Sequence, residues 1–161
     1  MELRTGLNQK FNMDTKDIYS ECLKLDNQLC FPLYAAGREV VSQYTPFLKE
    51  LNITYTQYIV FMVLWEEKSI TVKDLGNRLY LDSGTLTPLL KKLEVEGYIK
   101  RNRDKSDERV VIVSLTDLGW ELREKAKQIP FKVGQCLKMD IEDAKKLKEL
   151  LYKFLNSLEI D

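Results

Sequence analysis

The amino-acid sequence predicts a mainly α-helical fold with one small β-hairpin, and two observations carry this prediction. Apolar residues recur at three- and four-residue steps through most of the chain, which is helical periodicity. Residues 98–115 instead combine β-branched residues with a polar turn. The chain has 161 residues and 44% of them are hydrophobic, enough for one core. We expect a loose tail at residues 1–13 and a single domain at residues 14–161.

The first helical segment covers residues 14–44, and Pro32 interrupts it. Proline lacks a backbone donor and clashes with the preceding turn. Either the main helix therefore begins near Cys30 or the helix bends there. Both alternatives place Cys30 beside backbone N–H groups that have no partner within the helix.

Residues 53–68 are predicted to form a buried central helix. They are mostly apolar and contain no glycine or proline. Thr54 and Gln57 have the spacing of a capping box, which marks the start of a helix. Residues 69–71 follow as a short, β-prone stretch.

Two short amphipathic helices are predicted next, over residues 72–80 and 82–98. Asp82 and Ser83 are good N-cap residues for the second helix. Gly97 stands where a helix C-terminus favours a left-handed residue. The pattern predicts two consecutive helices joined by a sharp turn.

The rest of the chain predicts a hairpin and two long helices. Residues 98–103 and 109–115 read as antiparallel strands around the polar turn "DKSDE". Thr116 opens a long helix, which Pro130 bends or ends. Residues 141–159 form a last amphipathic helix.

This order of helices followed by a basic hairpin predicts a winged helix-turn-helix, in which the second short helix enters the major groove of DNA and the hairpin reaches the flanking minor groove. Short side chains near the start of the reading helix allow close approach to phosphates and base edges, and cations contact phosphates. The acid two residues before Arg109 is expected to orient its guanidinium. The predicted DNA-binding residues are Ser83, Gly84, Thr85, Thr87, Lys91, Lys92, Arg101, Arg103, Asp107 and Arg109.

Composition excludes several classes of protein. The chain has no histidine, which excludes most zinc and iron sites and every histidine-based catalytic triad, so we expect no enzyme, metal or cofactor. No apolar run approaches the roughly 18 residues that span a membrane, and no secretory signal opens the chain, which favours a cytoplasmic protein. The formal net charge is zero, so DNA binding rests on local clusters of positive charge.

Residues 81–119, with Asp107 and Arg109 in an Asp-x-Arg wing element, resemble the MarR family of bacterial repressors. The resemblance implies a homodimer that binds a pseudo-palindromic double-stranded operator. Residues 51–115 would form the winged helix-turn-helix. The segments at 14–50 and 116–161 would supply the dimerisation helices.

The segments "NQLCFPLYAAGREVVSQY" and "NITYTQY" are similar to the organic-hydroperoxide-sensing (OhrR-type) branch of that family. The resemblance extends over residues 20–158. It implies that Cys30 is a redox-sensing thiol whose oxidation by organic hydroperoxide makes the protein release DNA. Tyr34, Tyr44 and Tyr55 would be the tyrosines whose hydroxyls, from both subunits, surround the thiol.

The chemistry after the first oxidation stays open at this point. A sulfenic acid at Cys30 can persist, become a sulfinic acid or condense with another thiol. In two-cysteine members of the branch the resolving thiol comes from the C-terminal part of the other subunit, so Cys136 is the expected partner. The alternatives are that Cys136 is a bystander or that a small cellular thiol forms a mixed disulfide. Cys22, about two helical turns before Cys30, is too far away for a disulfide without unwinding.

Three other functions compete with the thiol switch. A MarR-like repressor could be released by a small aromatic ligand while Cys30 stays inert. A thiol peroxidase would need a recycling reductant, and the sequence lacks a thioredoxin-like pattern and a CxxC motif. A dimeric adaptor that does not bind DNA would have no use for Ser83, Thr85, Thr87 and Arg109.

Overall fold

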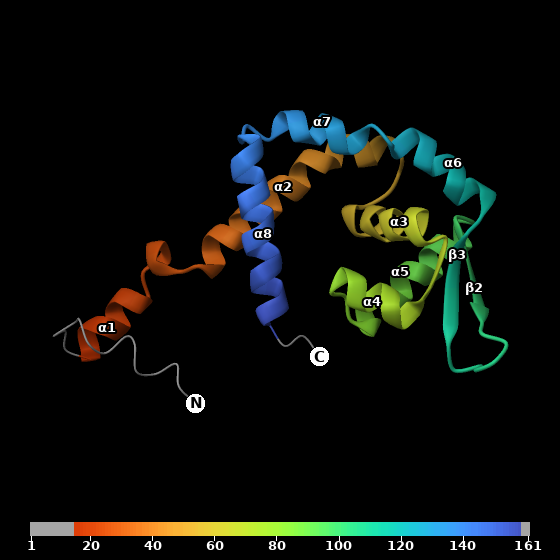
Figure 1. Cartoon of the computed structure of the whole chain (residues 1–161), viewed down its shortest axis with the longest axis horizontal. Coiled ribbons are helices and arrows are strands. Elements are labelled where there is room, and N and C mark those ends of the chain that lie inside the picture. The colour runs from red at the N-terminus through yellow and green to blue at the C-terminus, as the bar shows by residue number, and fades with distance from the viewer. Residues whose placement is uncertain (1–14, 159–161) are drawn as a thin grey trace. The chain divides into compact units, whose positions relative to one another are not determined.

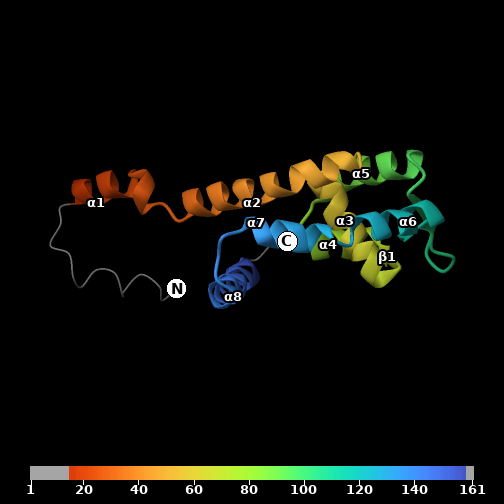
Figure 2. The same ribbon diagram turned by 90° about the horizontal axis from the view of Figure 1, so that it is seen from above.

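The computed structural model describes residues 15–158, and the tail expected at 1–13 lies outside this range. In chain order its elements are α1 (Thr15–Cys22), the 3₁₀ turn η1 (Leu25–Asn27), α2 (Cys30–Glu50), α3 (Tyr55–Glu67), β1 (Ser69–Thr71), α4 (Val72–Leu79), α5 (Ser83–Val95), β2 (Ile99–Arg103), β3 (Val111–Leu115), α6 (Asp117–Ala126), α7 (Ile129–Cys136) and α8 (Ile141–Ser157). Figure 1 labels the α-helices and the strands β2 and β3, and Figure 2 labels β1.

The chain forms two compact units that divide between Val40 and Val41, within α2. In the first unit, α1 ends at Cys22, and Asn27 Nδ2 donates a hydrogen bond of 2.9 Å to the carbonyl of Glu21. A new helix, α2, then begins at Cys30, with Pro32 in its first turn, where the missing N–H needs no partner. The first of the two alternatives for Pro32 is therefore confirmed.

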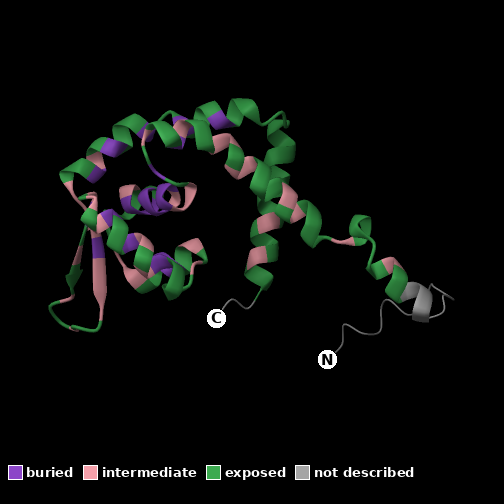
Figure 3. Cartoon of the chain, turned by 180° about the vertical axis from the view of Figure 1, so that it is seen from behind, coloured by how far each residue is buried: buried purple, intermediate pink, exposed green. Residues whose placement is uncertain are grey.

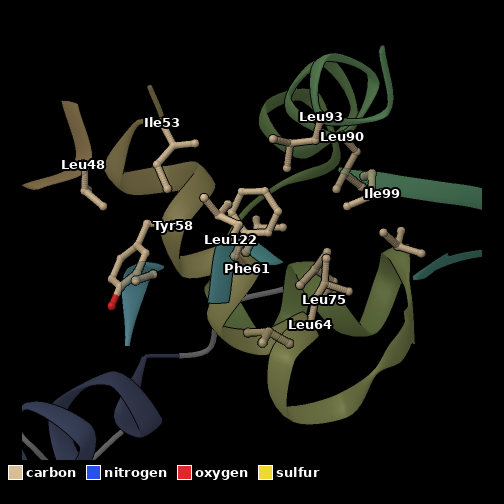
Figure 4. Close-up of a cluster of buried hydrophobic side chains, with 14 of the residues drawn as sticks. Leu48, Ile53, Tyr58, Phe61, Leu64, Leu75, Leu90, Leu93, Ile99 and Leu122 are labelled. Atoms are coloured by element: carbon tan, nitrogen blue, oxygen red, sulfur yellow. The ribbon is translucent and has the colours of Figure 1, made fainter. Parts of the chain in front are cut away.

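The second unit is built around α3, whose start is the capping box predicted from the sequence. The backbone N–H of Gln57 donates to Thr54 Oγ1 at 3.3 Å, and that of Thr54 donates to Gln57 Oε1 at 2.8 Å. Helices α4, α5 and α6 and the sheet surround α3. Figure 4 shows Phe61 and Leu64 of α3 among the leucines of the surrounding helices, and both are fully buried. We call α3 to β3 the winged head.

The sheet has three strands rather than the two of the expected hairpin. Its order is β1-β3-β2, and both pairs are antiparallel. Residues 69–71 add the extra strand, in which Ile70 lies opposite Val113. Thr71 ends this strand and its hydroxyl caps α4 by accepting from the N–H of Asp74 at 3.0 Å. Strand β1 therefore fixes the start of α4 beside Ile112, near the turn end of the hairpin.

The helix expected after Thr116 is two helices. α6 ends at Ala126, and α7 begins at Ile129 with Pro130 in its first turn, so the proline starts a helix here. α8 then turns away from α7, as the two views in Figures 1 and 2 show. None of its described residues is buried, and Figure 3 colours it green and pink throughout. None of the described helices is long and apolar enough to cross a membrane.

Candidate nucleic-acid interface and thiol site

Helix α5 begins with a side-chain cap that leaves its first residues exposed. The carboxylate of Asp82 accepts from the backbone N–H and the hydroxyl of Thr85, each at 2.9 Å. The backbone N–H of Thr85 is the largest cause that lowers the pKa of Asp82, so the cap is ionised at neutral pH. Ser83 and Gly84 are exposed beside it. The sequence-predicted start of the reading helix is therefore accessible and capped by Asp82.

The rest of α5 separates an anchoring face from a polar face. Its anchoring face is formed by Leu86, Leu90 and Leu93, each at most 1% exposed. Thr87 is half-buried, whereas Lys91 and Lys92 are exposed. Because the leucines hold the helix to the core, the polar face projects from a fixed support.

The turn between β2 and β3 is organised by two aspartates. Asp104 Oδ1 accepts from the N–H of Ser106 at 2.7 Å. Asp107 holds Arg109 through contacts at 3.0 Å to Nε and 2.9 Å to Nη2, and Arg109 lowers the pKa of Asp107. The side chain of Arg109 is nevertheless 89% exposed. This geometry presents a positioned, solvent-facing guanidinium at the tip of the wing.

Two other predicted DNA-binding arginines are engaged within the protein. Arg101 Nε donates to Glu94 Oε2 at 3.0 Å, its backbone N–H donates to Oε1 at 3.2 Å, and its side chain is only 23% exposed. Arg103 Nη1 donates to the carbonyl of Glu108. Arg101 thus ties the wing to α5, and Arg103 ties together the two sides of the turn.

All three cysteines carry free, exposed thiols. Cys30 is the first residue of α2, and its Sγ lies 3.9 Å from Oε1 of Gln28. The amide nitrogen of Gln28 donates to the carbonyl of Cys22, so this side chain connects the end of α1 with the thiol. Cys136 is the last residue of α7, and its Sγ lies 3.4 Å from the carbonyl of Lys132. Cys30 and Cys136 belong to different units of the chain.

The structure brings two of the three predicted tyrosines together. The rings of Tyr44 and Tyr55 meet edge to face, with centroids 5.0 Å apart. Tyr58, which is 2% exposed, lies 5.8 Å from Tyr44, and its burial raises its pKa to about 12. Tyr34 lies in the first unit, one helical turn after Cys30, and the guanidinium of Arg38 stands 5.8 Å from its ring.

Comparison with known proteins decides the family. The family model described as transcriptional regulator SarA/Rot matches residues 42–128. The organic hydroperoxide resistance transcriptional regulator of Bacillus subtilis (strain 168) is 52% identical over 136 residues, which cover 84% of this chain and 92% of that protein. The chain belongs to the MarR-type transcriptional regulators, in the OhrR branch.

A solved MarR-type structure, that of AbfR of Staphylococcus epidermidis, agrees with this assignment. Reduced AbfR bound to DNA is 39% identical, with a TM-score of 0.71 and coverage of 87% of this chain and 97% of that one. The disulfide form of AbfR has 37% identity, a TM-score of 0.59 and coverage of 87% and 98%. Overoxidized AbfR has also been solved on DNA, with 39% identity, a TM-score of 0.67 and coverage of 85% and 98%.

This MarR-type regulator is a DNA-binding transcriptional regulator with a winged helix-turn-helix, which confirms the predicted fold class, and the family consists of regulators rather than enzymes. Sequence reasoning missed Gln28, Tyr58 and Glu94. Only Tyr58 had a signal in the sequence, because it follows Tyr55 at helical spacing. The contacts of Gln28 and Glu94 depend on how two elements meet.

Proposed function

We propose that this regulator binds DNA as a homodimer and releases it when an organic hydroperoxide oxidises Cys30. The observation that carries the proposal is the free, exposed thiol of Cys30 at the first residue of α2. Backbone N–H groups at the start of a helix favour negative charge, and the thiolate is the form that attacks a peroxide. The 52% identity to an organic hydroperoxide resistance regulator supports the choice of oxidant.

The oxidation has a defined balance of atoms and electrons. The thiolate of Cys30 attacks one peroxide oxygen, the O–O bond breaks, and the alkoxide takes a proton and leaves as an alcohol. Sulfur is oxidised by two electrons and becomes a sulfenic acid. Condensation with a second thiol then forms an S–S bond and releases water.

We propose Cys136 of the second subunit as that thiol. It is free and exposed at the end of α7, with its side chain open to a partner. The disulfide form of AbfR and the overoxidized form on DNA support a disulfide, rather than further oxidation of one sulfur, as the releasing event. Two sulfurs must come to about 2 Å, so the bond would move the terminal helices and turn the reading heads away from their half-sites.

The tyrosines are assigned to the sensor by family resemblance and by their pairing. The rings of Tyr44 and Tyr55 are in edge-to-face contact and thus form an aromatic pair. Tyrosine hydroxyls donate hydrogen bonds without a permanent charge, and the rings favour an organic substituent on the peroxide. That these hydroxyls, together with Tyr34, surround the thiol stays a prediction.

On DNA, the start of α5 enters the major groove and Arg109 enters the adjacent minor groove. The exposed Ser83 and Gly84, with Thr85 and Thr87, support contacts at the groove edge, and Lys91 and Lys92 are exposed for phosphates. Arg109 is 89% exposed yet oriented by Asp107, which suits insertion into a narrow groove. Contact with genomic DNA supports a cytoplasmic location for the protein.

Dimerisation is assigned to the helices outside the winged head. The apolar side chains of α8 recur at helical spacing, and several of them are exposed, namely Leu147, Leu150 and Phe154, together with Leu158 at the C-cap. An apolar stripe of this kind on a DNA-binding regulator fits a second copy of the chain, and a dimer presents two reading heads to a pseudo-palindrome.

The test is binding to the DNA upstream of the protein's own gene, with and without one equivalent of cumene hydroperoxide. Wild type is expected to release DNA, and Cys30→Ser is expected to bind equally well and to stay bound. Cys136→Ser separates the two chemistries, since release by this variant would assign the switch to Cys30 alone. Retention of DNA by oxidised wild type would overturn the proposal and favour release by a small aromatic ligand, with Cys30 inert.

A further inference from the structure

A groove of about 550 Å³ lies between the start of α4, the side of α5 that carries Thr87 and Leu90, and the wing. Its floor is apolar, and its polar rim combines residues from all three elements: Thr71, Lys73, Asp74, Thr87, Arg101 and Arg109. Thr87 and Arg109 are already assigned to DNA. The rim therefore continues the proposed DNA-binding face onto α4, which the sequence did not include.

The three cations of this rim differ in how far their charge is compensated. Arg101 Nη2 lies 2.5 Å from Glu94 Oε2, and Arg109 Nη2 lies 2.9 Å from Asp107 Oδ2. Lys73 is exposed, and no carboxylate within residues 19–158 pairs with its ammonium. Lys73 thus carries the uncompensated positive charge of the groove.

The acid next to Lys73 in the chain is occupied elsewhere. Asp74 Oδ2 accepts from the hydroxyl of Thr71 at 2.7 Å, and the N–H of Asp74 donates back to Thr71 Oγ1 at 3.0 Å. This cap fixes the first turn of α4, while Thr71 is held in the sheet opposite Ile112 of β3. Lys73 therefore stands at a fixed place beside the wing.

We infer that Lys73 binds a backbone phosphate of the operator, between the major-groove contact of α5 and the minor-groove contact of Arg109. An ammonium is a compact charge that suits a phosphate oxygen, and phosphate contacts set the register of a protein on DNA without reading its sequence. Arg101, neutralised by Glu94, instead holds the wing against α5. The inference rests on the proposed DNA contacts of α5 and the wing.

A phosphate contact has a measurable signature in salt. Each phosphate that a protein neutralises on duplex DNA contributes about 0.9 to the slope of log affinity against log salt concentration. Two subunits of a dimer would contribute about 1.8 together. Loss of Lys73 should therefore weaken binding most at low salt and about equally on any duplex.

The experiment measures Kd from 50 to 300 mM salt for reduced wild type, Lys73→Gln, Lys73→Arg and Lys125→Gln. The probes are the upstream DNA and an unrelated duplex of equal length. Lys125 is the matched control, since it is an exposed lysine of α6 outside the groove. We expect Lys73→Gln to reduce the slope by about 1.8 on both duplexes, and Lys73→Arg and Lys125→Gln to keep it.

If wild type binds the upstream DNA and Lys73→Gln keeps the wild-type salt slope, the phosphate contact of Lys73 is overturned while the proposed function stands. A change confined to the upstream DNA would assign Lys73 to base readout and overturn the phosphate contact. Failure of wild type to prefer the upstream DNA would instead count against the proposed function itself. Circular dichroism of each variant checks that the fold is retained.

Discussion

The winged head and helix α8 belong to the same unit of the chain but are stabilised in different ways. In the head, Leu64 and Leu90 are at most 1% exposed, and the elements share one core. In α8, Leu150 is 63% exposed and none of the described residues is buried. The difference shows that the head packs into a core that it shares with α2, α6 and α7, whereas α8 carries an apolar face that is largely exposed.

The largest expected effect is a loss of stability in the winged head. Leu64→Ala removes a fully buried side chain from α3 and leaves a cavity, so we expect the free energy of unfolding to fall by about 3 to 5 kcal/mol. Denaturant unfolding followed by circular dichroism measures the loss. Val95→Ala, at a position 88% exposed on the same head, is the control and should change stability by less than about 0.5 kcal/mol.

The next effect separates association from folding. Leu150→Asp places a charge in the apolar stripe of α8, and a symmetric interface would meet it twice. We expect the dimer Kd to rise about 100-fold, roughly 2.8 kcal/mol, with the helical circular dichroism of the head retained. Sedimentation over a concentration series measures it. Asn156→Asp adds the same charge to the polar side of α8, so an equal shift there would count against the stripe as the interface.

A smaller effect compares the caps of the two regions. Asp82→Ala removes the acceptor for the N–H and hydroxyl of Thr85, and we expect a small loss of stability together with weaker DNA binding. Asp140 caps α8 through the N–H of Glu142 at 2.8 Å. Asp140→Ala should leave the DNA affinity of the dimer unchanged in a gel-shift titration. Equal losses of DNA affinity for Asp82→Ala and Asp140→Ala would contradict a specific role of the α5 cap in DNA binding.

The last effect is the smallest at neutral pH, where it is zero, and it develops only above about pH 10. Burial raises the pKa of Tyr58 to about 12, above its unfolded value of about 10. Between about pH 10 and 12 the hydroxyl of Tyr58 is ionised in the unfolded chain but still protonated in the folded protein. The free energy of unfolding should therefore be constant below about pH 10 and decline as pH rises through 12. Unfolding midpoints of wild type and Tyr58→Phe across this range test it. A decline of equal size in both proteins would show that Tyr58 is not responsible.

Local patterns were sufficient for much of the fold and part of the site. Thr54 with Gln57, and Asp82 with Thr85, cap their helices through neighbours three residues away, so their roles could be predicted from spacing. The wing element of Asp107 and Arg109 is equally local. Oxidation of Cys30 and the DNA contacts themselves stay predictions.

By itself, then, the sequence determined the helices, their caps and the turn of the wing, because each depends on residues within about one helical turn. Tertiary structure decided the features that join distant segments. Residues 69–71 form a strand only because β3 is there to pair with them. Likewise, Arg101 donates a hydrogen bond to Glu94, and Lys73 of α4 lies beside the wing, because the folded core brings separate elements together.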